Sequence, residues 1–210
     1  MANAPQAGKK SGRLITPPFR VSFPSVFEKA SYNNGTPRFS LTALFFPKLF
    51  NDADKLKWKA ISDGLNAQAI EGFKKPMKEL DRAVYKTPFH KGDEKEYEGY
   101  GDPDMRYCTL ANSKRRPQII DIRTGNAITS ENAEEFYAGC WARASVNPYW
   151  FNNIGKGIAL GLGNIQKLKD DQSFEGFTSA EDDFGSEDDD RFGSDDSDAG
   201  GSSGDDDDFA

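Results

Sequence analysis

The last 41 residues of the chain, positions 170–210, limit most strongly what this sequence can fold into. They contain 17 aspartates and glutamates and a single basic residue, Arg191, so their formal charge is −16. A segment with so much like charge and so few apolar side chains cannot bury enough surface to offset the entropy cost of ordering it. We therefore expect residues 170–210 to form a disordered acidic tail, and the folded part of the chain to lie upstream of it.

The upstream part carries the opposite charge. Residues 1–169 contain 26 basic and 17 acidic residues, a net charge of +9, so the sequence pI of about 4.9 averages a basic body and an acidic tail. Residues 1–13 mix Ala, Pro, Gly and Lys without periodicity, which predicts a disordered basic arm. Residues 14–169 are long enough for one domain with its own core.

Several classes of protein are disfavoured by what the sequence lacks. The two cysteines, Cys108 and Cys140, form neither a spaced set of metal ligands nor a disulfide framework, which favours a reducing, cytosolic setting. The glycines of residues 155–163 do not match a dinucleotide-binding fingerprint. No apolar run is typical of a secretory signal or a membrane span. We expect no cofactor, no metal and no membrane association.

Apolar periodicity predicts a mainly β domain with one packed helix. Residues 19–23 and 39–45 alternate apolar and polar side chains, as two strands of a long hairpin would, and Pro24 interrupts the first. Residues 51–73 place apolar side chains at steps of three and four, after a capping Asn or Asp. Residues 74–103, rich in charge, Gly and Pro, predict a long functional loop.

The most informative predicted strand covers residues 140–147. Its alternation places small apolar side chains on one face and Trp141 and Arg143 on the other, and Tyr149 and Trp150 follow within a run of three aromatics. An exposed aromatic beside an arginine suits single-stranded nucleic acid, because every base can stack on a ring and the guanidinium can meet phosphates. In the alternative reading, Trp141 plugs the sheet against the long loop and Arg143 pairs with a carboxylate.

Further candidate residues lie outside this strand. Two short β-like runs, residues 105–111 and 118–123, are joined by a turn that concentrates three positive charges. Together with neighbouring positions, that turn completes the set of candidate DNA-contacting residues: Lys114, Arg115, Arg116, Arg106, Tyr107 and Lys156.

Residues 137–149, followed by a glycine-rich segment that ends at residues 163–167, resemble the bacteriophage single-stranded DNA-binding protein family with an OB fold. Residues 16–20 and 39–45 are also similar to that family. The resemblance implies a five-stranded Greek-key barrel and a DNA groove of aromatic and basic residues. It also implies a non-catalytic role in protecting single-stranded DNA during phage DNA replication, recombination and repair, in the cytoplasm of the infected bacterial host.

The same resemblance implies a role for the end of the tail. In that family an acidic terminus contacts replication proteins such as DNA polymerase or helicase-primase. The matching residues here are Asp205, Asp206, Asp207, Asp208 and Phe209. Family tails commonly end in the aromatic residue itself, whereas here Ala210 carries the terminal carboxylate, which puts the docking mode in doubt. A homodimer is compatible with the sequence but is not required by it.

Three functional hypotheses follow from the charge pattern. In the first, the protein binds single-stranded DNA, and the tail occupies the basic groove as a phosphate mimic until DNA displaces it. In the second, it is a duplex-DNA organiser or histone-like chaperone with a regulatory acidic tail. In the third, it is a metal-dependent nuclease that uses Asp102, Asp104 and Asp121, although the first two of these carboxylates read equally well as part of a turn.

Overall fold

The computed structural model describes residues 12–31, 35–153 and 155–174, and every structural statement below concerns these residues. The chain divides into one unit of residues 1–176 and a second of residues 177–210, and all described residues belong to the first. Most of the predicted basic arm and most of the predicted acidic tail therefore lie outside the described residues.

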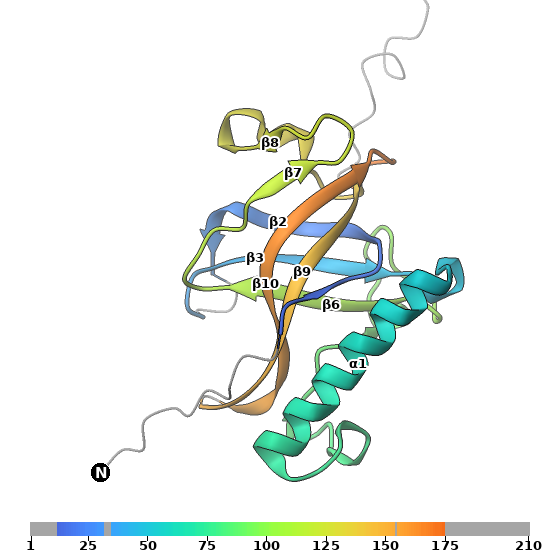
Figure 1. Cartoon of the computed structure of the whole chain (residues 1–210), viewed down its shortest axis with the longest axis vertical. Coiled ribbons are helices and arrows are strands. Elements are labelled where there is room, and N and C mark those ends of the chain that lie inside the picture. The colour runs from blue at the N-terminus through green and yellow to red at the C-terminus, as the bar shows by residue number, and fades with distance from the viewer. Residues whose placement is uncertain (1–11, 32–34, 154, 175–210) are drawn as a thin grey trace, which may run out of the picture. The chain divides into compact units, whose positions relative to one another are not determined.

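The first unit is mainly β with one long helix (Figure 1). Its strands are β1 (Leu14–Ile15), β2 (Phe19–Ala30), β3 (Arg38–Phe45), β4 (Tyr85–Lys86), β5 (His90–Lys91), β6 (Arg106–Asn112), β7 (Ile119–Asp121), β8 (Ala127–Ile128), β9 (Trp141–Asn153) and β10 (Gly155–Lys169). Strand β9 pairs with β2 and with β10, β3 pairs with β2 and β6, and β6 pairs with β10. These pairings run from β9 through β2, β3, β6 and β10 and return to β9.

The predicted hairpin of residues 19–23 and 39–45 is present as β2 and β3. The interruption predicted at Pro24 is wrong, because β2 continues through this proline to Ala30. The pairing register shifts between Ser22 and Ser25 instead, as in a β-bulge. A bulge leaves residues outside the regular hydrogen-bonded ladder, so the strand tolerates a proline there.

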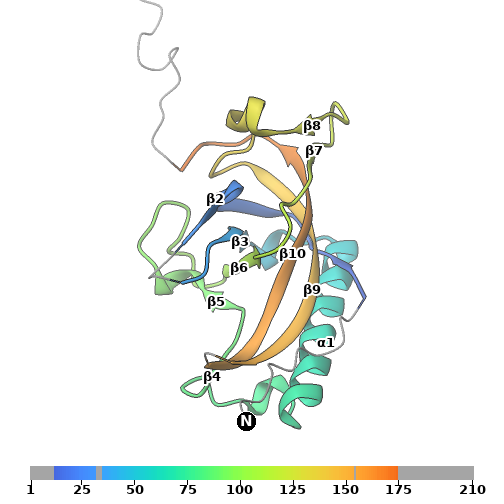
Figure 2. The same cartoon turned by 90° about the vertical axis from the view of Figure 1, so that its left-hand side faces the viewer.

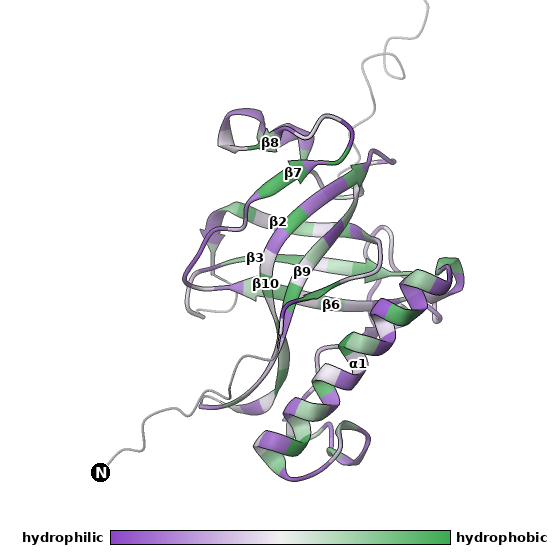
Figure 3. Cartoon of the chain, viewed as in Figure 1, coloured by the Kyte–Doolittle hydropathy of each residue, from purple (hydrophilic) through white to green (hydrophobic). Residues whose placement is uncertain are grey.

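The predicted helix is α1 (Asp52–Phe73), which contains hydrophobic and hydrophilic residues along its length (Figure 3). The side chain of Asn51 caps it by accepting a hydrogen bond from the Asp54 backbone N–H at 2.9 Å. Its fully buried apolar residues, Ile61, Leu65 and Ala69, follow the predicted spacing. In Figure 2, α1 lies along one side of the long β9 and β10 strands, and β2, β3 and β6 lie on the other side.

The predicted long loop of residues 74–103 contains local structure that its composition did not reveal. It includes two 3-10 turns, Met77–Glu79 and Gly92–Glu94, and the short strands β4 and β5. Strand β4 pairs in parallel with β10, and β5 pairs antiparallel with β6. The second pairing places His90 and Lys91 along the edge of β6, opposite Tyr107 and Arg106.

Within the described residues, no helix has the length and apolar content needed to cross a membrane.

Candidate nucleic-acid interface

Five aromatic side chains form a continuous row that joins β2, β5, β6 and the loop between β5 and β6. We call Phe23, Tyr97, Tyr100, Tyr107 and His90 the aromatic row. Successive ring centroids along it are 5.3, 5.8, 5.3 and 5.1 Å apart. The first three contacts are edge-to-face and the last is stacked, geometries that aromatic pairs favour.

Strand alternation explains why the row faces away from the core. On β6, Cys108 and Leu110 are fully buried. Tyr107 directly precedes Cys108 on this strand, so its side chain points to the opposite face. The hydroxyl of Tyr100 donates a hydrogen bond to Ser22 Oγ at 3.3 Å, which ties the loop to β2. Burial raises the pKa of both Tyr100 and Tyr107, so these phenols stay neutral at physiological pH.

Phe23 occupies an unusual backbone conformation at the end of this row. Its φ is +46°, in the left-handed region that a bulky residue rarely adopts, and it immediately precedes Pro24. The register shift of β2 surrounds it, and 49% of the residue is exposed. Strain of this kind persists where the surrounding structure enforces it and is concentrated at functional sites. The bulge thus turns an aromatic ring out to the surface.

Trp141 lies on the outer face of β9, as the alternation of residues 140–147 predicted. Its Nε1 donates a hydrogen bond to Asp171 Oδ2 at 2.6 Å. Its ring lies 5.9 Å from the Phe46 ring and 5.4 Å from the ammonium of Lys169. The opposite face of β9 is buried as expected, with Cys140, Ala142, Ala144 and Val146 at most 2% exposed.

Arg143 lies in a different place from the aromatic row. Its Nε donates a hydrogen bond to Gln166 Oε1 at 2.7 Å. The alternative reading predicted a carboxylate partner, and the observed partner is an amide. It lines an open groove of about 600 Å³ together with two other cationic residues, Arg13 and Lys57, and with exposed Ile120. The structure therefore separates Arg143 from Tyr107, although the sequence grouped them in one candidate set.

The adjacent residues Tyr149 and Trp150 point to opposite sides of β9. Trp150 packs on α1, where an added Cβ at Gly72 would collide with the indole, and its ring lies 6.1 Å from that of Phe73. Tyr149 is 37% exposed, and its ring lies beside Gly161 on the neighbouring strand. Of the two, Tyr149 is the more exposed, and Trp150 is half-buried.

The remaining basic candidates lie at the ends of strands. Lys114, Arg115 and Arg116 are exposed in the β6–β7 connection, where the guanidinium of Arg116 lies 5.3 Å from the Phe27 ring. Arg106, next to Tyr107, donates to the carbonyl of Pro103 at 2.7 Å. Lys156 is the second residue of β10 and is exposed. Phe23, Tyr97, Tyr100 and His90 were missed as site residues, although aromatics within a charged loop and before a proline were a usable signal.

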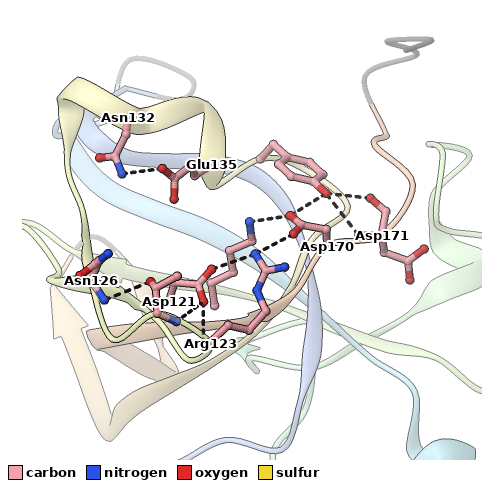
Figure 4. Close-up of polar contacts among 10 residues, drawn as sticks. Asp121, Arg123, Asn126, Asn132, Glu135, Asp170 and Asp171 are labelled. Carbon is pink, nitrogen blue, oxygen red and sulfur yellow. Dashed lines mark hydrogen bonds and ion pairs between the residues drawn. The ribbon is translucent and has the colours of Figure 1, made fainter. Parts of the chain in front are cut away.

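A network of charged side chains fixes the end of β10 to β7 (Figure 4). Lys167, only 3% exposed, pairs with Asp170 at 2.5 Å, and Asp170 also pairs with Arg123 at 3.0 Å. The Tyr137 hydroxyl adds a hydrogen bond to Asp170 at 3.1 Å. Partial burial opposes ionisation of Asp170, but the hydrogen bond and charge of Lys167 hold its pKa below the usual range. Asp170 is thus bound to the domain by three side chains.

The carboxylates of the nuclease hypothesis have structural partners. Asp121 accepts hydrogen bonds from the backbone N–H groups of Arg123 and Thr124, and the bond from the Arg123 side chain lowers its pKa. Asp104 pairs with Lys48, and Asp102 accepts a hydrogen bond from the Asp104 backbone. Among the residues that the structure describes, no three potential metal-binding side chains gather. The tail candidates Asp205 to Phe209 lie outside the described residues.

A protein-family model described as the single-stranded DNA-binding protein of Enterobacter phage Enc34 matches residues 12–193 of this chain. This match confirms the resemblance inferred from residues 137–149. Protein p50 of Acyrthosiphon pisum secondary endosymbiont phage 1 is 29% identical over 163 residues, which cover 75% of this chain and 83% of that protein.

Solved structures of the Enc34 single-stranded DNA-binding protein resemble the fold described above. The structure in complex with single-stranded DNA has a TM-score of 0.62 and 22% identity, and the match covers 82% of this chain and 99% of that one. A second structure of the same Enc34 protein has a TM-score of 0.58 and 22% identity, and covers 87% of this chain and 99% of that one. At this identity the likeness establishes a common fold.

Proposed function

Because this chain belongs to the family of single-stranded DNA-binding proteins represented by that of Enterobacter phage Enc34, we propose that it binds single-stranded DNA without sequence preference and carries out no catalysis. The observation that supports a binding surface most directly is the aromatic row. Its rings lie on the outer face of β2 and β6, where they contribute little to the core. Every base presents a π-face, so such a row accepts any sequence.

The strand pairings support an OB barrel as the scaffold. The circuit from β9 through β2, β3, β6 and β10 back to β9 has five strands, the number in an OB barrel. OB folds bind oligonucleotides across the face of their second and third strands. In this circuit those strands are β3 and β6, and Tyr107 belongs to β6.

Bases and phosphates have separate partners along this face. We assign base stacking to the aromatic row and to Tyr149, and phosphate contacts to cations near the row, among them the half-buried Arg106 and the exposed Lys91. Each phosphate neutralised by a lysine or arginine releases counterions, so affinity falls as salt rises, with a slope of about −0.7 per contact for single strands. Arg143 lies in a separate groove and contributes, in this assignment, through charge alone.

The acidic tail completes the proposed function. Its composition suits two roles: competition with DNA for the basic surface, and recruitment of replication proteins through Asp205 to Phe209. Both roles fit a protein that protects single strands in the cytoplasm of an infected bacterium and hands them to replication, recombination or repair enzymes. Removal of residues 175–210 is expected to tighten oligonucleotide binding at low salt and to have less effect at high salt.

The direct test is a titration of a fluorescent dT oligonucleotide with the full chain and with Tyr97→Ala and Tyr107→Ala at two salt concentrations. Each variant removes one stacking platform, so affinity should fall about 5- to 150-fold, the range for about 1–3 kcal/mol per stacked base. Leu56→Ala is the control, because Leu56 is 69% exposed on α1, outside the row. Wild-type affinity in both tyrosine variants would remove the row from the interface.

Two further measurements separate the competing functions. A duplex of the same sequence, titrated at the same salt, should bind more weakly than the single strand; equal or tighter duplex binding would favour the DNA-organiser hypothesis. Incubation of the oligonucleotide with the protein and Mg²⁺ should leave it intact, and its cleavage would restore the nuclease hypothesis.

A further inference from the structure

The chain that follows β10 turns back over the outer face of the domain instead of leaving it. Asp170 is held by the nearly buried Lys167, and the next four residues, 171–174, lie across β2 and the start of β9. We call residues 171–174 the strap. The strap brings one carboxylate and one aromatic ring onto the same surface as Trp141 and the end of the aromatic row.

The carboxylate of the strap belongs to Asp171. It accepts a hydrogen bond from Trp141 Nε1 at 2.6 Å and lies 3.7 Å from the guanidinium of Arg20. The carbonyl of Gln172 accepts a second hydrogen bond from Arg20 at 2.5 Å. An indole N–H beside a guanidinium is a set of donors that suits an anionic oxygen, whether it comes from a carboxylate or from a phosphate.

The aromatic ring of the strap is Phe174. The guanidinium of Arg20 lies 4.3 Å from the centre of this ring, as it would over a nucleobase. The backbone N–H of Phe174 donates to the Ala138 carbonyl at 3.0 Å. Gly99 and Gly139 make room for the strap, since a Cβ at Gly99 would collide with the Phe174 ring and one at Gly139 with the Gln172 carbonyl.

Phe174 borders a small cavity of about 170 Å³ whose other walls include Phe23 and Tyr97, the first two members of the aromatic row. Ser22, Glu98 and Ala138 complete its lining. The carboxylate of Glu98 would repel a phosphate, but it can accept a hydrogen bond from the amino group of a base. The lining therefore suits a base, and the donors around Asp171 suit the neighbouring phosphate.

We propose that this pocket is a nucleobase subsite at the end of the aromatic row, and that the strap closes it from within the chain, with Phe174 in the place of a base and Asp171 in the place of a phosphate. The inference rests on the proposed function and adds a regulator to it. Single-stranded DNA opens the strap when it enters the subsite, while Asp170 keeps the strap tethered.

The contacts of the strap are weak enough for this exchange. Ion pairs and cation–π contacts between partly exposed groups stabilise weakly, and both Asp171 and Gln172 are exposed. When only a fraction of molecules has an open subsite, the apparent dissociation constant equals the intrinsic one divided by that fraction. Loss of the Phe174 ring should therefore tighten DNA binding about two- to fivefold, which corresponds to a cation–π contact of about 0.5–1 kcal/mol.

The test compares the full chain with Phe174→Ala, and with Leu56→Ala on α1 as the control, in titrations with a fluorescent dT oligonucleotide. Phe174→Ala should lower the dissociation constant about two- to fivefold, and Leu56→Ala should leave it unchanged. Asp171→Ala removes the carboxylate of the strap and keeps the Trp141 and Arg20 donors for a phosphate, so it should also tighten binding. Equal or weaker binding by Phe174→Ala, with wild-type melting temperature, would overturn the strap as a competitor.

Two more readouts test the pocket itself. Hydrogen exchange of the full chain should show faster exchange in residues 171–174 when the oligonucleotide is saturating, and unchanged or slower exchange would refute displacement. Phe23→Ala should weaken oligonucleotide binding if the pocket takes a base, whereas tightening like that of Phe174→Ala would mean that the pocket serves the strap alone. If no variant and no wild-type protein binds the oligonucleotide, the proposed function fails; if only the strap predictions fail, DNA binding stands.

Discussion

The pair between Lys167 and Asp170 predicts an unequal response to the removal of its two members. Lys167 is 3% exposed, and its ammonium lies 2.5 Å from Asp170, whose side chain is 45% exposed. Asp170→Asn would leave the buried ammonium without its anion. A hydrogen bond to a charged group stabilises by about 1.5–3 kcal/mol, and the larger losses of about 3–5 kcal/mol seen for fully buried pairs are an upper limit because water reaches Asp170.

Lys167→Met is the opposite change, because it removes the buried charge and keeps most of the side-chain volume. Asp170 then retains Arg123 and Tyr137 as partners, so the loss should stay below about 1.5 kcal/mol. Urea unfolding followed by circular dichroism measures the free energy of unfolding of both variants. In a thermal melt, a loss of about 1.5–3 kcal/mol in Asp170→Asn should lower the melting temperature by roughly 3–12 °C. The double variant should match Lys167→Met. A Lys167→Met variant less stable than Asp170→Asn would refute the reasoning.

Three other predictions concern two carboxylates with lowered pKa values, the core beneath α1, and Arg143. Hydrogen bonds from Arg123 and Trp141 lower the pKa of Asp121 and Asp171 respectively. The two carboxylates therefore stabilise the folded state above the ordinary carboxyl pKa, and this stabilisation is lost as pH falls through the lowered pKa values. The urea concentration at the unfolding midpoint should accordingly drop below about pH 4. Leu65→Ala, at a fully buried position of α1, should cost about 2–5 kcal/mol in urea unfolding and leave the oligonucleotide affinity of the folded protein unchanged. Arg143→Ala should keep the wild-type melting temperature and reduce the salt slope of oligonucleotide binding by about 0.7, and an unchanged slope would show that its groove carries no DNA.

Local rules predicted the elements of this fold well where a single face is buried. In residues 140–147 the alternation assigned Cys140, Ala142, Ala144 and Val146 correctly to the core. It was wrong for Ser145, which it placed on the outer face, because Ser145 is 6% exposed and its hydroxyl accepts a hydrogen bond from the Asn164 backbone. The capped, periodic segment at residues 51–73 likewise became α1. Pro24 misled the prediction because a bulge in β2 removes the need for its missing N–H, and a bulge depends on pairing that a single strand does not reveal.

The candidate site was harder to predict because it depends on contacts between distant segments. The row joins Phe23 of β2 to Tyr97 and Tyr107, which lie more than 70 positions later in the chain. Nothing in the local pattern around Tyr97 indicates that it meets Phe23. Similarly, the sequence placed Asp170 in a tail on charge alone, whereas its ion pair with Arg123 depends on the end of β10 lying beside β7.

The structure fits neither of the two interpretations of Trp141 that the sequence left open, because the strap contacts this side chain. The indole is neither a plug buried against the long loop nor a free platform, because Asp171 from the strap holds its N–H and Lys169 lies over its ring. A single-stranded DNA phosphate offers the same acceptor as Asp171, so the indole can exchange one for the other without rearrangement of β9. Trp141→Ala then has two opposing effects on affinity, loss of a DNA contact and release of the strap. Asp171→Ala, which releases the strap and leaves the indole in place, separates them.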